Sequence, residues 1–167
     1  MRVLTSTMNQ MSDKRDGFEL QRILQDVYNR IRSVALTSAG LVIKAASSAV
    51  AKTGAAITYL IAEGVQQSIA AGTDMPAFTG TVANGLYCPY VFSIDKAGTT
   101  YVQQGTSGAS LAAMRYPELE PTRAVVGIVV IHPTVGSFTG GTSALDSTAA
   151  NAVYISPVGM FDPSATV

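Results

Sequence analysis

From Ser33 onward the sequence keeps no helical period for long, and this feature limits the possible folds more than any other. Short runs of β-branched and aromatic residues are separated by Gly, Asn, Asp and Pro, a pattern typical of strands joined by turns. The long crossover helices that a parallel α/β sheet requires are missing from this pattern. We therefore expect a mainly β protein, with a β-sandwich or jelly-roll-like body of roughly seven to nine short strands.

Most of the expected strands can be placed by their apolar content and by the turns between them. The expected segments are a strand at 40–45 and two hairpins, which pair 56–62 with 65–69 and 87–94 with 99–104. The second hairpin turns at residues 95–98, where Gly98 can adopt the positive φ that such turns need. Both hairpins indicate antiparallel pairing.

The segment Ala124–Ile131 is apolar without alternation, which predicts a strand buried on both faces at the centre of the domain. Pro133 ends this strand. Residues 136–150 are small and include several glycines, so we expect a loop there. A last strand is expected at residues 151–156, before Pro157.

The first part of the chain differs from the rest in charge and in periodicity. Ten of the 22 charged residues lie in the first 32 positions, with a net charge of +2, and the remainder carries −2. Ser12 or Asp13 can cap a helix there. Apolar residues recur at spacings of four, three, four and three, which predicts an amphipathic helix whose stripe is Leu20, Leu24, Val27, Ile31 and Val34. We divide the chain into an N-terminal arm and amphipathic helix at 1–34 and a β body at 35–167.

This helical stripe has two open interpretations. It packs on the chain's own domain, or it docks on a partner. The terminal position of the helix, the arm before it with little apolar periodicity, and its different composition favour a partner. We therefore take the five residues of the stripe as the candidate partner-binding site.

Charge and cysteine content exclude several classes of protein. The chain has 11 basic and 11 acidic residues, so it lacks the clustered positive charge that nucleic-acid binding needs. Cys88 is the single cysteine, which leaves no intrachain disulfide. The longest uncharged run, residues 124–145, contains Pro133 and four glycines and is not a transmembrane helix. With no export signal in its first ten residues, we expect a chain made in a cytoplasm and not bound to a membrane.

Residues that could carry chemistry are few. His132 is the only imidazole, no G-x-S-x-G motif surrounds any serine, and Cys88 lies in an apolar run that predicts a buried thiol. Glu118 and Glu120 lie between two prolines in a segment that we expect to be a rigid extended surface connection. The glycine-rich segment 138–143 lacks the lysine of a phosphate-binding loop. We expect no enzyme activity, no cofactor and no metal.

The C-terminal half of the chain carries three motifs in succession. A strand ending near a proline, at 125–133, is followed by an F-x-G-G-T-x-x-L-D loop at 138–146 and an N-A-V-Y-I strand at 151–155. This succession resembles a family of small virion proteins of tailed bacteriophages. Residues 38–44 and 79–82 are similar too, so the resemblance covers most of residues 34–163 but not the N-terminal arm and helix.

The resemblance implies a non-enzymatic structural protein of the virion. Within this family we expect a capsid cement or decoration protein on the outer surface of a phage head, assembled in the host cytoplasm. Its expected partners are the phage major capsid protein and further copies of itself, as a homodimer or homotrimer associated through the β body. The helical stripe is then expected to dock on capsid protein or on its counterparts.

Two alternatives stay open. One is a head or tail fibre protein, in which the helix is the base of a trimeric stalk and the β body binds a host surface. The other is a carbohydrate-binding module, because β-sandwiches often bind sugar with exposed tyrosines, here Tyr59, Tyr90 or Tyr101.

Overall fold

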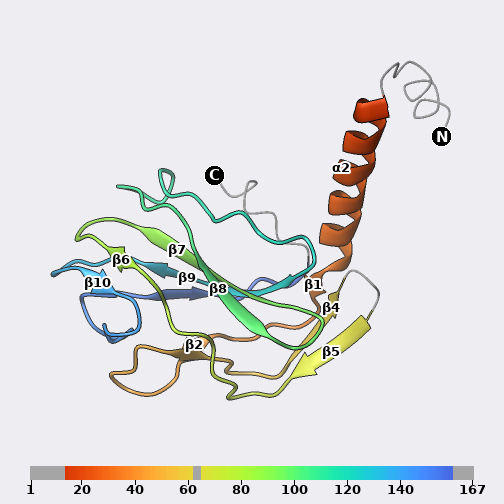
Figure 1. The fold of residues 1–167 in the computed structure, drawn as a ribbon. Helices are drawn as coiled ribbons and strands as arrows, with labels where there is room; N and C mark the ends of the chain where they lie inside the picture. Colours follow the sequence, from red (N-terminus) through yellow and green to blue (C-terminus); the bar gives the residue numbers. More distant parts are fainter. Residues whose placement is uncertain (1–13, 62–64, 160–167) are drawn as a thin grey trace.

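The computed structural model describes residues 14–61 and 65–159 (Figure 1). Over these residues the protein consists of one α-helix, α2 (Lys14–Arg32), followed by short strands that pair in four antiparallel sheets. The expected mainly β fold with an N-terminal helix is therefore confirmed. The proposed caps of the helix, Ser12 and Asp13, lie outside the described residues.

The largest sheet has four strands in the order β11 (Val153–Ile155), β9 (Ala124–Ile131), β7 (Cys88–Ile94) and β8 (Thr100–Gln104). All three pairings are antiparallel. β7 and β9 occupy the middle of the sheet, and every residue of β7 is buried. Seven of the eight residues of β9 are buried as well, which confirms the strand expected at 124–131.

A second sheet contains β1 (Val34–Ala35), β4 (Ile57–Ile61) and β5 (Val65–Ile69). Along β4 the side chains of Ile57, Tyr59 and Ile61 are buried and alternate with less buried ones, so one face of this sheet points into the core. β1 and β4 both contact β9. The two sheets therefore enclose a shared core, as in a β-sandwich.

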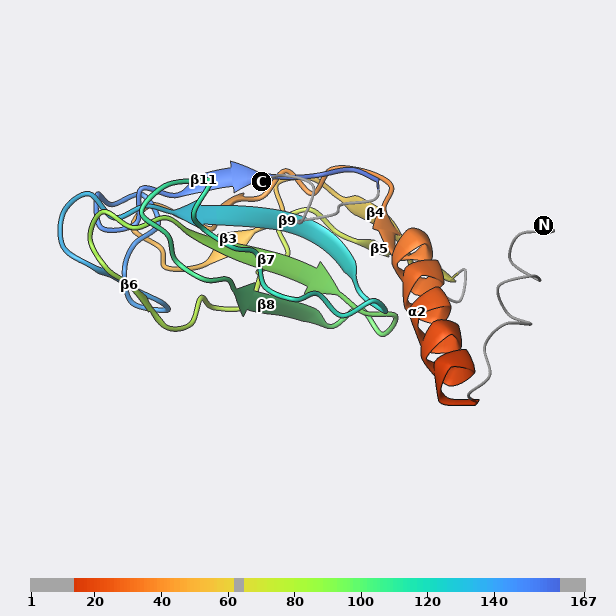
Figure 2. The ribbon, with the colours of Figure 1, turned by 90° about the horizontal axis from the view of Figure 1, so that it is seen from above.

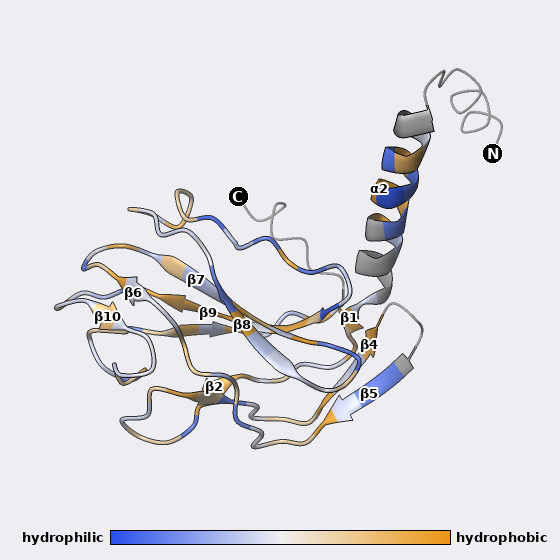
Figure 3. Ribbon diagram, viewed as in Figure 1, coloured by the Kyte–Doolittle hydropathy of each residue, from blue (hydrophilic) through white to orange (hydrophobic). Residues whose placement is uncertain are grey.

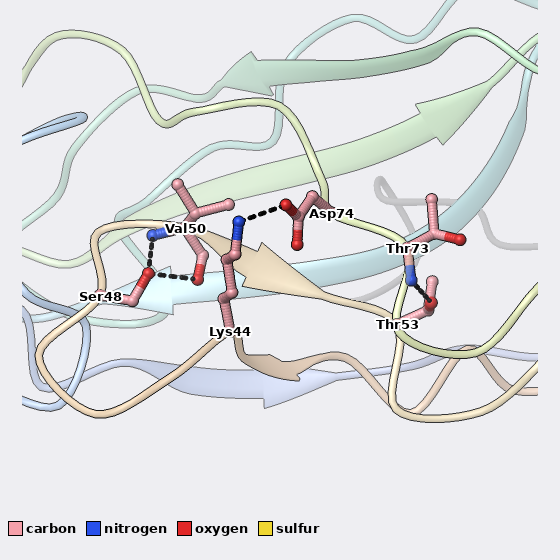
Figure 4. Close-up of polar contacts among 6 residues, drawn as sticks. All are labelled: Lys44, Ser48, Val50, Thr53, Thr73 and Asp74. Atoms are coloured by element: carbon pink, nitrogen blue, oxygen red, sulfur yellow. Dashed lines mark hydrogen bonds and ion pairs between the residues drawn. The ribbon is translucent and has the colours of Figure 1, made fainter.

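Two further pairs of short strands complete the body. β2 (Val42–Ile43) pairs with β3 (Ala51–Lys52), and β6 (Thr81–Val82) pairs with β10 (Phe138–Thr139). The β2–β3 connection is held by local hydrogen bonds (Figure 4). The Ser48 hydroxyl accepts a bond from the Val50 amide at 3.1 Å and donates one to the Val50 carbonyl at 3.3 Å.

Long-range polar contacts attach this hairpin to the next segment of the chain. Lys44 forms an ion pair with Asp74, and the amide of Thr73 donates to the hydroxyl of Thr53 at 3.0 Å (Figure 4). The Thr53 hydroxyl in turn donates to the Ala70 carbonyl at 2.9 Å. Because Thr53 is buried, this bond satisfies a polar group that would otherwise cost free energy.

Four aromatic rings form the centre of the core. Phe78 packs edge-on against Tyr90, Phe92 and Phe138, with ring centroids 4.9, 5.3 and 5.8 Å apart. These rings come from a loop, from β7 and from β10, so the cluster joins segments that are far apart in the sequence. The Tyr90 hydroxyl remains satisfied because it donates to the carbonyl of Thr79 at 2.9 Å.

The other face of the four-stranded sheet is covered by the segment that follows β8. Met114 and Leu119 pack on Val91, Ile128 and Val130 and form a second, smaller apolar cluster. The connection at 116–121, expected as an extended surface segment, thus contributes a buried leucine. This cover explains how β7 and β9 can be buried on both faces.

Three expectations need correction. Residues 136–150, expected as a loop of small residues, contain β10, whose Phe138 is fully buried. The strand expected at 40–45 is limited to Val42–Ile43. Val34, expected as the last residue of the helical stripe, lies in β1 and pairs with Leu60, because the helix ends at Arg32.

Helix α2 projects away from the β body, as Figures 1 and 2 show from two directions. It joins the body at β1 and contacts β4. In the part of the chain with described coordinates, no helix combines the length and the apolar character needed to cross a membrane.

Candidate functional site

The residues of the predicted stripe differ in their surroundings. Leu24 and Val27 are 50% and 48% exposed, and Leu20 is partly buried. Val34 is partly buried in β1. The side chain of Ile31 lies outside the described part of the structure. The stripe therefore presents an apolar surface along the projecting part of α2, and its last residue belongs to the body.

Two further apolar residues widen this surface. At about 100° per residue, Ile23 and Tyr28 flank the stripe on its two sides, and both side chains are about half exposed. Phe18 lies on the opposite side of the helix and is 71% exposed. Figure 3 shows the resulting mixture of apolar and polar segments along α2. Exposed apolar side chains arranged on one helical face are typical of an interaction surface.

A groove lies on the outer face of the four-stranded sheet, with a volume of about 660 Å³. It lies between the segment after β8 and the edge formed by β9 and β11, and most of its lining is apolar. On one side the rings of Tyr87 and His132 are stacked, with centroids 3.8 Å apart and planes 5° apart. Leu111, Val153 and Ile155 line it and are exposed. This groove was not predicted, because it is built from four segments that are distant in the sequence.

His132 and Cys88 are explained by local structure. The backbone amide of His132 donates to the carbonyl of Ala150 at 2.9 Å, and the imidazole stacks on Tyr87. The Cys88 thiol is fully buried and donates to the carbonyl of Gly105 at 3.6 Å. The prediction of a buried thiol is therefore confirmed.

A polar cluster surrounds Asp95 in the turn between β7 and β8. Its carboxylate accepts hydrogen bonds from the amides of Ala97 and Thr99 and from the Tyr101 hydroxyl, all at 2.9 Å. The guanidinium of Arg123 lies over the Tyr101 ring, 3.7 Å from its centroid. Gly98 in this turn has φ +83°, as the sequence predicts.

These contacts change how Asp95 titrates. Partial burial raises the pKa of the carboxyl, but the bonds from Thr99, Tyr101 and Ala97 and the charge of Arg123 outweigh it and hold the pKa below its ordinary value. The hydrogen bond to Asp95, followed by desolvation, raises the pKa of Tyr101. The cluster is a self-contained turn in which the hydrogen bonds stabilise the charged carboxylate.

The remaining candidates for chemistry have structural roles or lie in solvent. Glu118 and Glu120 are exposed. In the segment 138–143, the Gly140 amide donates to the Gly80 carbonyl at 2.8 Å and the Thr139 amide to the Ser143 hydroxyl at 2.9 Å. These amides are not free to hold a phosphate. Across residues 14–61 and 65–159, no three His, Cys, Asp or Glu side chains are grouped closely enough to hold a metal ion.

The tyrosines considered for sugar stacking do not form a binding face. Tyr59 and Tyr90 are buried, so neither ring can stack on a ligand. One face of Tyr101 is occupied by Arg123. Tyr87, Tyr116 and His132 line the groove, where the rings of Tyr87 and His132 stack on each other.

Together these features define a mainly β protein with a projecting amphipathic helix that carries exposed apolar side chains. Comparisons with protein-family models, with curated proteins and with solved structures found no match.

Proposed function

We propose that this protein is a non-enzymatic structural protein of a phage virion, a cement or decoration protein on the outer surface of the head. The observation that carries the proposal is the combination of a closed β body with an exposed amphipathic helix that projects from it (Figures 1 and 2). The resemblance of residues 34–163 to small virion proteins of tailed phages supports the same class.

The body has the properties that a lattice unit needs. Only 12 of the chain's 22 charged residues follow position 32, and the central strands of the body are buried on both faces. Such a body is rigid and carries little charge, so it can pack closely beside copies of itself or beside capsid subunits without strong repulsion. The helix then provides the contact that extends beyond the body.

The partner-binding residues in this proposal are those of the helical stripe. Leu20, Leu24 and Val27 line the projecting part of α2 at helical spacing. Complete burial of a leucine-sized side chain contributes roughly 1.5 to 3 kcal/mol. Leu24 and Val27 are already about half buried, so burial against a partner adds about half of this free energy for each side chain. Several such side chains are needed to exceed the ordering cost of association.

The second candidate function is a head or tail fibre protein, and the projection of the helix from the body is the observation that supports it. A projecting amphipathic helix is also the geometry expected at the base of a fibre stalk. The two functions differ in where the protein is found on the particle and in how many copies are present.

The test is the copy number of this protein in purified virions of the virus that encodes it, measured by quantitative mass spectrometry. Copies in proportion to the capsid subunits support decoration, and copies in proportion to a single vertex or tail support a fibre. Absence of the protein from virions would refute both. A cryo-EM map of the same particles shows whether the β body lies on the outer surface.

A further inference from the structure

Helix α2 is not covered by the β body over most of its length (Figures 1 and 2). Among the described residues, its main contact with the body is with β4, near the point where the helix joins β1. Its 19 residues correspond to a length of roughly 28 Å, along which other helices can approach without meeting the body. The apolar face described above is therefore accessible to a partner.

The apolar residues of α2 follow a heptad pattern, in which positions a and d face a partner helix. In this pattern Gly17, Leu24 and Ile31 occupy a positions, and Leu20 and Val27 occupy d positions. We call these five residues the heptad seam. Glu19 and Arg22 fall at positions c and f, which point away from the seam, and both are exposed.

The flanking positions distinguish a second copy of this helix from an unrelated partner. In a parallel pair in register, the g residue of one helix lies beside the e residue five positions later on its neighbour. This rule places Ile23 beside Tyr28, two apolar side chains that are each about half exposed in a single copy. It also places Asp16 beside Gln21, with no repulsion between like charges. The helix is therefore complementary to itself.

The same residues indicate how many copies associate. Leu24 at a and Val27 at d favour three or more strands, whereas Ile31 at a and Leu20 at d favour two, so the number of copies is decided by the residues that flank the seam. Apolar residues at both flanks widen the face, which a single neighbour would leave partly exposed. We infer that three copies of this protein associate through a parallel bundle of their α2 helices, with the β bodies together at its C-terminal end.

This inference shares one premise with the proposed function, namely that α2 is the element that binds a partner. It adds that the partner of the stripe is another copy of the chain. It locates self-association in the helix, as the fibre alternative does, whereas for a decoration protein the sequence suggested that copies associate through the β body. Because it is tested on purified protein without capsids, the two proposals can fail separately. A trimer that is absent from virions would refute only the proposed function, and a virion protein that is monomeric when purified would refute only this inference.

The experiment is sedimentation equilibrium of the full chain over a range of protein concentrations. We expect a monomer–trimer equilibrium, with a limiting mass three times the 17.3 kDa of the chain. Leu24→Glu places a charge in the seam and should raise the concentration at half-association by at least roughly 100-fold. Phe18→Glu is the matched control, because it makes the same change on the opposite, exposed side of the helix and should leave the equilibrium unchanged.

A gain-of-function variant protects the test against a simple loss of folding. Gly17 is a seam position where an added Cβ meets nothing within 4 Å, so a larger side chain has room. Gly17→Leu should tighten association by at least roughly 10-fold relative to Gly17→Ala, which improves helix propensity equally but adds no seam side chain.

Each alternative result overturns the inference. A chain that stays monomeric, or that forms only dimers or tetramers, contradicts the trimer. Equal association of the Leu24→Glu and Phe18→Glu proteins would place the contact outside the seam. Identical behaviour of the two Gly17 variants would also contradict the seam, since only leucine reaches a neighbouring helix.

Discussion

The replacement of Phe138 by alanine tests whether residues 136–150 form part of the core or a surface loop. Phe138 is fully buried and packs edge-on against Phe78 and Tyr90, with centroid distances of 5.8 and 6.1 Å. Burial of the ring contributes roughly 1.5 to 3 kcal/mol, and each aromatic pair adds about 0.5 to 1.5 kcal/mol. These values agree with the roughly 3 to 5 kcal/mol that removal of a buried phenylalanine costs.

We therefore expect Phe138→Ala to lower the free energy of unfolding by about 3 to 5 kcal/mol. The measurement is urea denaturation followed by circular dichroism at one fixed protein concentration. For a chain of this size the midpoint of thermal unfolding should fall by roughly 6 to 20 °C. Phe138→Leu keeps most of the apolar volume but loses the edge-on contacts, so its cost should be about 1 to 1.5 kcal/mol.

The control is Phe18→Ala, which removes the same side chain from an exposed site on α2 and should change the free energy of unfolding by about 0.5 kcal/mol or less. A loss of less than about 1 kcal/mol for Phe138→Ala would refute the aromatic core as described. In that case the segment would be the surface loop that its composition suggests.

Three further predictions concern the turns and the thiol. Gly140→Ala should lower the free energy of unfolding by about 2 kcal/mol or more in urea denaturation, because the new Cβ would lie 2.6 Å from the backbone of Phe78. Gly85→Ala is the control: Gly85 has open space around it and φ +78°, so the same change should lower the free energy of unfolding by only about 1 kcal/mol. Asp95→Asn should cost about 0.5 to 1.5 kcal/mol at pH 7. Since the folded protein holds the pKa of Asp95 below its ordinary value, this stabilisation is present above pH ~4 and is lost as the pH falls through the folded pKa. The difference between the two proteins in urea denaturation should therefore decrease as the pH is lowered below about 4. Cys88 should react with a thiol reagent only at the rate of unfolding, and rapid reaction in the folded state would contradict its burial.

Local patterns were sufficient to predict the strands that carry their own signal. The unbroken apolar segment of β9 and the hairpin formed by β7 and β8 were both placed within about one residue. Gly98 adopts the positive φ expected of it because the turn leaves no other choice without strain. In each case the information lies within about ten consecutive residues.

The parts that sequence reasoning missed depend on contacts between distant segments. Phe138 lies among small polar residues, and its burial follows only from the pairing of β10 with β6, whose Val82 lies far earlier in the chain. Leu119 is buried because the segment after β8 folds back over Ile128. Val34 continues the helical spacing, yet its pairing with Leu60 in the sheet overrides that preference.

The candidate site likewise has one part that the sequence predicts and another part that depends on the fold. The spacing of Leu20, Leu24 and Val27 predicted an apolar helical face, because that face is a property of one helix. The projection of the helix from the body was not predictable, since it depends on what the body leaves uncovered. The groove beside Tyr87 and His132 was not predicted because segments distant in the sequence form its lining, as they form the surroundings of Phe138.

The exposed helix also has an energetic consequence that supports association. A helix of 19 residues is only marginally stable in water, because most helical stability in proteins comes from packing of the apolar face. Among the described residues, the main packing of α2 in a single copy is against β4, while the central strands of the body are buried on both faces. The body therefore has its own core, and burial of Leu24 and Val27 against other chains would give the helix the packing that stabilises it.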